Sequence, residues 1–264
     1  MYSKEHLLFI KKIKKRNLLV RITQISILIF FLLTWEFLSY YELINTFLYS
    51  SPSKVFNTII NLFTSNNLFN HIGITLYETI LSFLISSLLG LSIATLLWSN
   101  KFISDVIDPY LTVLNSLPKV ALGPLIIIWV GASINSIILM ALLISTFISI
   151  INIYNGFIST NKNHILLMKS LHATKRQIFL KLVIPSNINN LINTFKINIS
   201  MNLIGVIMGE LLVSKSGLGY LIMYGSQVFN INLTITSTLV LGLISYIMYY
   251  LLNKIDLYLK KKQS

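Results

Sequence analysis

The sequence predicts an all-α, polytopic membrane protein with about six transmembrane helices. Hydrophobic residues make up 55% of the 264 residues and charged residues only 11%, and the mean hydropathy is +0.75. A soluble domain carries about 25% charged residues, so this chain lacks the polar surface that a water-facing globule requires. The apolar residues also gather in segments long enough to cross a bilayer.

Six segments are expected to span the membrane, namely residues 22–40, 72–98, 110–130, 136–157, 188–212 and 231–252. The first follows a basic head and lacks a small-residue cleavage site, which favours a retained signal anchor over a secretory signal peptide. The moderately apolar residues 51–69, which follow it, predict a helix lying along the outer surface.

The span at residues 110–130 is the one with an alternative. It follows a polar patch, and Pro109 predicts the start of its helix. Pro118 and Pro124 interrupt its apolar run. Proline is tolerated in a membrane helix where neighbouring groups satisfy the freed carbonyls, so both a full span and a re-entrant segment fit this pattern.

The distribution of basic residues predicts the orientation. The net charge is +13, from 21 Lys and Arg against 8 Asp and Glu. With six spans, only Lys54 and Lys215 fall in connections on one side, and only Lys119 and Lys196 fall within spans. The positive-inside rule then predicts that the chain lies in a bacterial cell membrane with both termini on the cytoplasmic side. Basic residues divided among loops in this way exclude a nucleic-acid groove.

The expected organisation is a basic cytoplasmic segment at residues 1–21, a single permease domain at 22–257 and a basic tail at 258–264. Within the domain, the longest polar connection is the loop at about 159–187. It predicts a short helix with Leu171, Ile178 and Leu182 near one face, ended by Pro185. One interpretation is a solvated basic loop that only sets topology. The other is a helix that docks on a cytoplasmic partner.

Three segments in the same order resemble permease subunits of binding-protein-dependent ABC importers of the nitrate/sulfonate/taurine type. The first is the loop, with Leu171-His172-Ala173 where such permeases have Leu-Gly-Ala, and Val183-Ile184-Pro185 where they have Val-Leu-Pro. The second runs from Ser116-Leu117-Pro118 to Trp129-Val130-Gly131. The third is Gly209-Glu210-Leu211-Leu212 followed by Ser216-Gly217-Leu218-Gly219. Together they cover about residues 108–222.

The loop also departs from the pattern of the family. Leu166-Leu167-Met168 stands where the family has Glu-Ala-Ala, His172 where it has glycine, and Asn189 where it has a second proline. These departures concern the segment that the resemblance assigns to ATPase coupling, whose residues in this chain are Leu171, His172, Ala173, Gln177, Ile178 and Pro185.

The resemblance implies a type I ABC importer permease that forms the translocation pathway for a small solute, such as an anion, a sulfonate or a vitamin precursor. It implies a homodimer in the lipid bilayer with two cytoplasmic ATPase subunits and an extracytoplasmic solute-binding protein. ATP is then used by the partner subunit, and the chain itself is expected to be no enzyme and to bind no cofactor. Two alternatives stay open: a self-sufficient secondary transporter and a non-transporting membrane paralogue.

Polar residues within spans are functional candidates, because they are costly to bury in a bilayer. Asn189, Asn193, Lys196 and Ser200 form a stripe on the fifth span. The stripe predicts either a solute pathway or a helix–helix contact.

Glu210, Gly217 and Gly219 predict a gate or an interface. Glu78 and Lys119 predict either an ion pair between the second and third spans or side chains that snorkel to the cytoplasmic interface from near the ends of their helices. The four histidines show no metal-ligand spacing and are expected in loops or at the surface, so no metal site is predicted.

Overall fold

The computed structural model describes residues 4–65 and 67–263, so the ends of the expected terminal segments (residues 1–3 and 264) lie outside the described residues. All regular structure in the described part is helical, which confirms the all-α prediction. The helices, in chain order, are α1 (Lys4–Tyr40), α2 (Thr46–Tyr49), α3 (Pro52–Thr64), α4 (Asn67–Ser99), α5 (Lys101–Ser116), a 3-10 turn (Lys119–Leu122), α6 (Gly123–Val130), α7 (Ile134–Ile158), α8 (Lys162–Ser170), α9 (Lys175–Ile178), a π-helical turn (Phe179–Val183), α10 (Ile184–Ser186), α11 (Ile188–Val213), α12 (Leu218–Gln227) and α13 (Ile231–Gln263).

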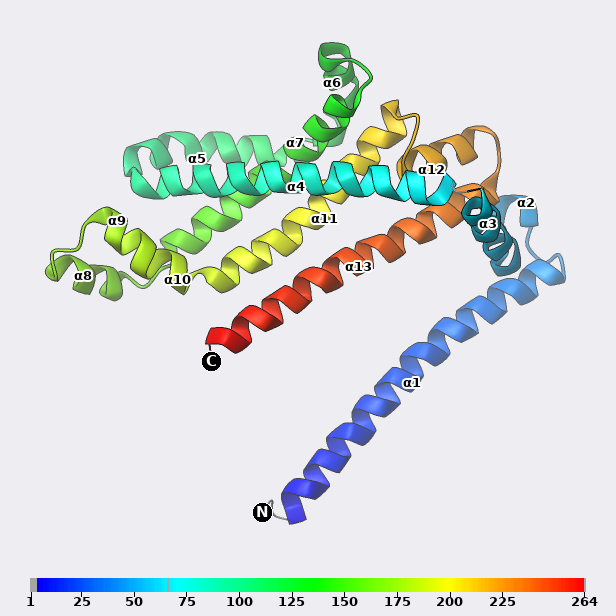
Figure 1. Ribbon diagram of the computed structural model, residues 1–264, viewed down its shortest axis with the longest axis horizontal. Helices are drawn as coiled ribbons and strands as arrows, with labels where there is room; N and C mark the ends of the chain where they lie inside the picture. The colour runs from blue at the N-terminus through cyan, green and yellow to red at the C-terminus, as the bar shows by residue number, and fades with distance from the viewer. Residues whose placement is uncertain (1–3, 66, 264) are drawn as a thin grey trace.

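Four long helices form the body of the molecule. Helices α4 and α11 both pack along α7, and α13 packs against α11 and α12. Helices α8 to α10 lie at one end of this bundle, and α12, α2 and α3 lie at the other (Figure 1). We call these the α8 end and the α12 end. Helix α1 begins away from the bundle and reaches it at its C-terminal end, beside α3.

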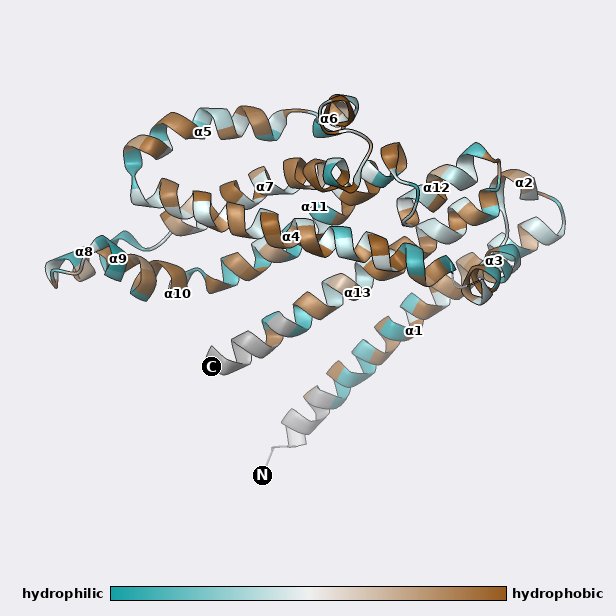
Figure 2. Ribbon diagram, turned by 45° about the horizontal axis from the view of Figure 1, so that its top comes forward, coloured by the Kyte–Doolittle hydropathy of each residue, from teal (hydrophilic) through white to brown (hydrophobic). Residues whose placement is uncertain are grey.

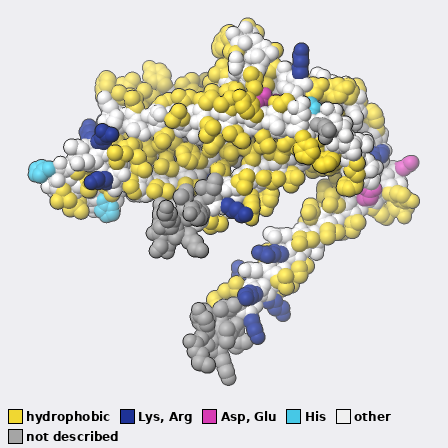
Figure 3. Space-filling model, viewed as in Figure 1, with side chains coloured by type: hydrophobic (Ala, Val, Ile, Leu, Met, Phe, Trp, Pro, Cys, Tyr) yellow, Lys and Arg dark blue, Asp and Glu magenta, His cyan; other side chains and the backbone are white. Residues whose placement is uncertain are grey.

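The length and apolarity of the helices confirm a multi-pass architecture. Five helical stretches are long and apolar enough to cross a membrane, at Lys11–Tyr40, Asn67–Ser99, Ile134–Ile158, Ile188–Val213 and Ile231–Lys254. Hydrophobic side chains cover the long helices on the face shown in Figure 3, while Lys and Arg gather along the first half of α1 and at the α8 end. The hydropathy colouring of Figure 2 likewise places hydrophilic residues on the α8–α9 segment.

The segment expected to span at residues 110–130 is broken. Helix α5 begins at Lys101, because the side chain of Asn100 caps it by accepting from the N–H groups of Phe102 and Ile103. Pro109 therefore lies inside a helix, and the prediction that it starts one is wrong. The helix pair Lys101–Ser116 and Lys119–Val130 is bent by 83°, a change of direction at Pro118, which cannot donate a helical hydrogen bond.

Close helix contacts depend on small residues. A Cβ added to Gly205 on α11 would lie 2.4 Å from the Cα of Ala141 on α7, and one added to Gly209 would lie 2.8 Å from the Cα of Ile137. This Gly-x-x-x-Gly spacing lets the two backbones approach as closely as helix pairs do in membranes.

Buried amides join the same helices. The side-chain N–H groups of Asn198 donate to Ser86 and Ser87 on α4, and Asn202 accepts from Ser145 on α7 at 3.0 Å. These hydrogen bonds satisfy polar groups that would otherwise be costly inside the bundle.

Candidate coupling segment, pathway and capped outer helix

The loop at 159–187 folds as two short helices joined by a tight turn. Helix α8 ends in a Schellman motif, in which Ala173 N–H donates to Met168 O at 3.0 Å and His172 N–H donates to Lys169 O at 2.9 Å. This motif requires a left-handed residue after the C-cap, and His172 has a φ of 55°. The position where the resemblance leads one to expect glycine is thus one where a β-carbon is strained.

The expectation that Leu171 and Ile178 share one face of a single helix is wrong. The turn separates them: Leu171 is 69% exposed, whereas Ile178 is 3% exposed and packs against the bundle with Val183 and Phe157. Leu166 and Leu167 on α8 are also exposed, at 61% and 59%. The outward apolar surface of this segment is therefore on α8 and its turn, and Ile178 anchors the segment.

The second half of the segment begins with a side-chain cap at the start of α9. Thr174 and Gln177 form a capping box at the start of α9: Thr174 N–H donates to Gln177 Oε1 at 2.8 Å, and Gln177 N–H donates to the Thr174 hydroxyl at 3.3 Å. Ala173 is half-buried, while Pro185 is exposed in α10 after the π-helical turn. The six predicted coupling residues thus lie along one segment but do not form one surface.

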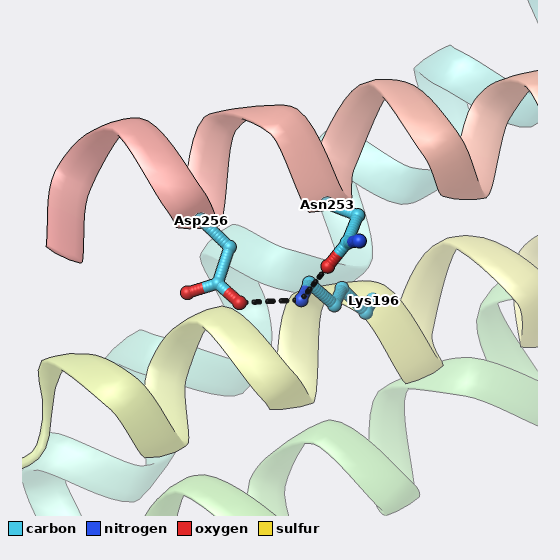
Figure 4. A network of polar contacts seen from close by, with 3 residues as sticks. All are labelled: Lys196, Asn253 and Asp256. Carbon is cyan, nitrogen blue, oxygen red and sulfur yellow. Dashed lines mark hydrogen bonds and ion pairs between the residues drawn. The ribbon is translucent and has the colours of Figure 1, made fainter. Parts of the chain in front are cut away.

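Lys196, the buried cation of the predicted pathway stripe, holds two helices together. Its Nζ lies 2.6 Å from Oδ2 of Asp256 and donates to Oδ1 of Asn253 at 3.0 Å, both on α13 (Figure 4). Asp256 has a second interaction besides this one. Of the two interpretations of the stripe, the helix–helix contact is therefore the one that Lys196 fits. Sequence reasoning missed Asp256, although a lysine inside a span calls for a nearby acid.

The stripe also borders a groove. Asn193, Lys196 and Ser200 line an open groove of about 500 Å³ together with Met201 and Tyr249. Asn189 is exposed and is not among the lining residues. Three of the four predicted pathway residues are thus brought together at one concave surface between α11 and α13.

Glu210, Gly217 and Gly219 form one compact unit at the α12 end. Glu210, at the end of α11, is 1% exposed. Its Oε2 accepts from Gly219 N–H at 2.5 Å, inside the first turn of α12. Helix N-termini bind carboxylates because their first N–H groups have no partner within the helix. Gly217 has a φ of 107°, and a Cβ on it would lie 2.4 Å from Cδ of Glu210.

Helix α4 completes this unit through Thr75 and His71, for which the sequence predicted no site role. The Thr75 hydroxyl donates to Oε1 of Glu210 at 2.6 Å and accepts from Leu218 N–H at 2.9 Å. His71 is half-buried on α4, and its Nδ1 accepts from Gly217 N–H at 2.9 Å. The expectation that His71 is a loop or surface residue is wrong. Among the described residues, no group of three or more His, Cys, Asp or Glu side chains lies close enough together to hold a metal ion.

Glu78 belongs to the same region, and its predicted pair with Lys119 is not formed. The carboxyl of Glu78 lies within hydrogen-bonding distance of the carboxyl of Glu210. Lys119 Nζ instead donates to the backbone and side-chain oxygens of Asn115, each at 3.1 Å, and lies over the ring of Phe147. The break at Pro118 separates Lys119 from α4 and explains the difference.

Several apolar helices of membrane-spanning length, with a helical projection at one end and a carboxylate-capped helix at the other, define a multi-pass membrane protein. A sequence profile for the family described as "binding-protein-dependent transport system inner membrane component" matches residues 82–263. The chain therefore belongs to this family, and it is an ABC importer permease of the nitrate/sulfonate/taurine type.

Relatives and solved structures agree with this assignment. The chain is 30% identical over 174 residues to the formylaminopyrimidine transport permease protein ThiX of Halalkalibacterium halodurans, covering 66% of this chain and 69% of that one. It is 28% identical over 198 residues to a protein of Bacillus subtilis named as an aliphatic sulfonates transport permease, covering 75% and 72%. Its fold matches a chain of the inward-facing MetNI methionine ABC transporter with a TM-score of 0.65 at 18% identity, covering 73% and 95%.

Proposed function

We propose that this chain is the permease subunit of an ATP-driven importer and that α8 and its turn dock on a separate cytoplasmic ATPase. The observation that carries the proposal is the set of exposed leucines on this projection, Leu166, Leu167 and Leu171. Exposed apolar side chains on a short helix outside the membrane fit a groove on a partner protein. The basic residues beside them on the same segment support a cytoplasmic α8 end, with both termini and the ATPase on the same side of the membrane.

The mechanism follows from how the projection is anchored. Ile178 and Val183 are buried against α4 and α7 in one cluster with Ala94 and Phe157, so a push on α8 is transmitted to the long helices. Two copies of the chain would enclose the pathway, and a solute-binding protein would deliver solute at the α12 end. ATP binds only to the partner subunit.

The solute is a small polar molecule. The related permeases carry names for a formylaminopyrimidine and for aliphatic sulfonates, so a vitamin precursor and a sulfonate or other small anion are the classes to test. The groove lined by Asn193, Lys196 and Ser200 lies along the first half of α11, and the Glu210–Gly217–Gly219 unit lies at its last turn, as expected of a pathway segment and an outer gate.

A pull-down tests the coupling. Detergent-solubilised wild type is incubated with candidate ATPase subunits of the same cell beside Leu171→Asp and Leu167→Asp variants. Both variants place a charge on an exposed site, so they are expected to fold and to lose the ATPase. Leu257→Asp is the matched control, because Leu257 is exposed to a similar degree, at 61%, but lies on α13. Retention of the ATPase by both α8 variants would overturn the docking surface.

The same preparation also distinguishes the ATP-driven importer from a self-sufficient secondary transporter. The buried ion pair of Lys196 and Asp256 is the observation that favours it, since coupled ionisable groups inside spans drive such transporters. Solute uptake by the chain alone in liposomes, with no ATPase bound, would establish that alternative. Uptake that depends on the ATPase and ATP supports the importer.

A further inference from the structure

Glu78 is a buried carboxyl that lines a cavity. Its side chain lies on α4 and is 2% exposed. Its Oε2 is buried, and no N–H or O–H group of the described residues donates to it. A buried carboxyl oxygen without a donor is costly and rare in folded proteins. A donor from a bound molecule is one way in which such an oxygen is satisfied.

The neighbouring carboxyl does not supply that donor. Glu210 is already an acceptor for the hydroxyl of Thr75 and the N–H of Gly219, which is the pattern of an ionised carboxylate. The carboxyl of Glu78 lies within hydrogen-bonding distance of that carboxylate, so the two groups share one proton and together have one negative charge. Oε2 of Glu78 is left without a donor. An anion such as a sulfonate is repelled there, whereas an N–H group is attracted.

The cavity is large enough for a small solute. Its volume is about 530 Å³, and its walls come from α4, the start of α7 and the connection between α11 and α12. The lining residues are Ile74, Glu78, Ala132, Ser133, Ile134, Ile137, Val213, Ser214, Lys215 and Ser216. Four features therefore coincide at the α12 end: a cavity, a buried carboxyl without a donor, apolar walls and hydroxyl groups.

Lys215 is the other charged residue at this cavity, and it is exposed. An exposed ammonium is screened by water and contributes little to the field at a buried carboxyl. It can still meet an acceptor group on a molecule held by Glu78. The lining thus suits a solute with N–H donors at one end and an acceptor at the other.

We propose that this cavity is a solute subsite in which the carboxyl of Glu78 accepts hydrogen bonds from a small amino-bearing solute and discriminates against sulfonates and other anions. The inference rests on the proposed importer function and narrows its solute class. No covalent step is involved: the solute binds, passes and leaves unchanged.

Binding to the permease in lipid nanodiscs tests the subsite. The probes are 4-aminopyrimidine, which presents N–H donors on a flat ring, and benzenesulfonate, a ring of the same size with an anionic group. Saturable binding is measured by equilibrium dialysis, and the amount of attached ATPase is measured on the same sample. Wild type is expected to bind 4-aminopyrimidine and to bind benzenesulfonate at least about tenfold more weakly.

Two variants report on the cavity. Glu78→Met removes both carboxyl oxygens but keeps a side chain of similar length, and it is expected to weaken 4-aminopyrimidine binding by about tenfold or more. Ala132→Trp fills the cavity from its exposed wall, and it is expected to abolish binding even if Glu78→Met folds poorly. Glu42→Met is the matched control, because Glu42 is an exposed carboxyl in the loop after α1, and it should bind as wild type does.

The outcomes separate the two proposals. If 4-aminopyrimidine shows no saturable binding, or binds both cavity variants as tightly as wild type, the subsite is wrong, whatever the ATPase does. Tighter binding of benzenesulfonate would also overturn it. If the ATPase fails to attach while 4-aminopyrimidine still binds through Glu78, the subsite stands and the coupling proposal fails.

Discussion

Glu210 of α11 and Gly219 of α12 are joined by a hydrogen bond of 2.5 Å from the Gly219 N–H to the Glu210 carboxylate. The contact makes the last turn of one helix the N-terminal cap of the next. The contact requires glycine beside the carboxylate, because a β-carbon would collide with it. It also requires a second hydrogen-bond donor to the other carboxylate oxygen. Two predictions test these requirements.

Gly217→Ala is expected to destabilise the protein by about 2 kcal/mol or more. Its φ of 107° is one that residues with a β-carbon rarely adopt, and the new Cβ would lie 2.4 Å from Cδ of Glu210. The measurement is the apparent melting temperature of the solubilised protein by fluorescence-detected size-exclusion chromatography. Gly73→Ala is the control, since a Cβ there has nothing within 4 Å; equal melting temperatures for the two variants would contradict the prediction.

Thr75→Val should cost about 1 to 3 kcal/mol, because it leaves both Oε1 of Glu210 and the N–H of Leu218 without their partner. Thr79→Val is its control: the Thr79 hydroxyl is also buried on α4 but donates only to the backbone oxygen of Thr75 within the helix. The same melting assay, with amide exchange at Leu218, compares the two. A cost as large at Thr79 would show that any buried threonine of α4 behaves alike.

His172→Gly is expected to stabilise the turn after α8 by about 1 kcal/mol, since glycine adopts a φ of 55° without strain. Hydrogen exchange of the Ala173 amide, which donates to Met168 O at 3.0 Å, should become slower. His164→Gly, inside α8, should have the opposite effect of similar size because glycine is a poor helix former. Faster exchange at Ala173 in the His172 variant would contradict the assigned turn.

Lys196→Met and Asp256→Leu should each destabilise the protein, on the order of 3 kcal/mol, because each leaves its partner's charge buried. The double variant should cost clearly less than the sum of the two, since it removes both charges. Melting temperatures of the four proteins complete the double-mutant cycle. Strict additivity would mean that the 2.6 Å pair contributes no interaction energy.

The long spans were predictable because hydropathy over a bilayer-length window is a property of the sequence alone. Five of them lie where the apolar segments predict. The 83° bend between α5 and α6 was predictable only as an alternative, since Pro118 permits a kink but does not set its angle. The start of α5 was missed because one side chain, Asn100, decides it.

The site was predicted less completely. Glu210, Gly217 and Gly219 were grouped through resemblance, but Thr75 and His71 come from a helix far away in the chain, and no local pattern marks them. The coupling turn was missed because apolar spacing alone cannot reveal a left-handed residue at His172. Lys196 was identified as a costly buried cation, yet its partner Asp256 lies 60 residues away, and only tertiary packing selects it.

The π-helical turn at Phe179–Val183 has a consequence in terms of chain length. A π turn accommodates one residue more than an α turn, so this stretch behaves as a one-residue insertion between the docking projection and α11. Deleting one residue there would continue the α-helical geometry into α10, where Pro185 alone donates no hydrogen bond. The same deletion would rotate α8 by about 100° relative to the bundle and would turn its exposed leucines away from the direction they face now.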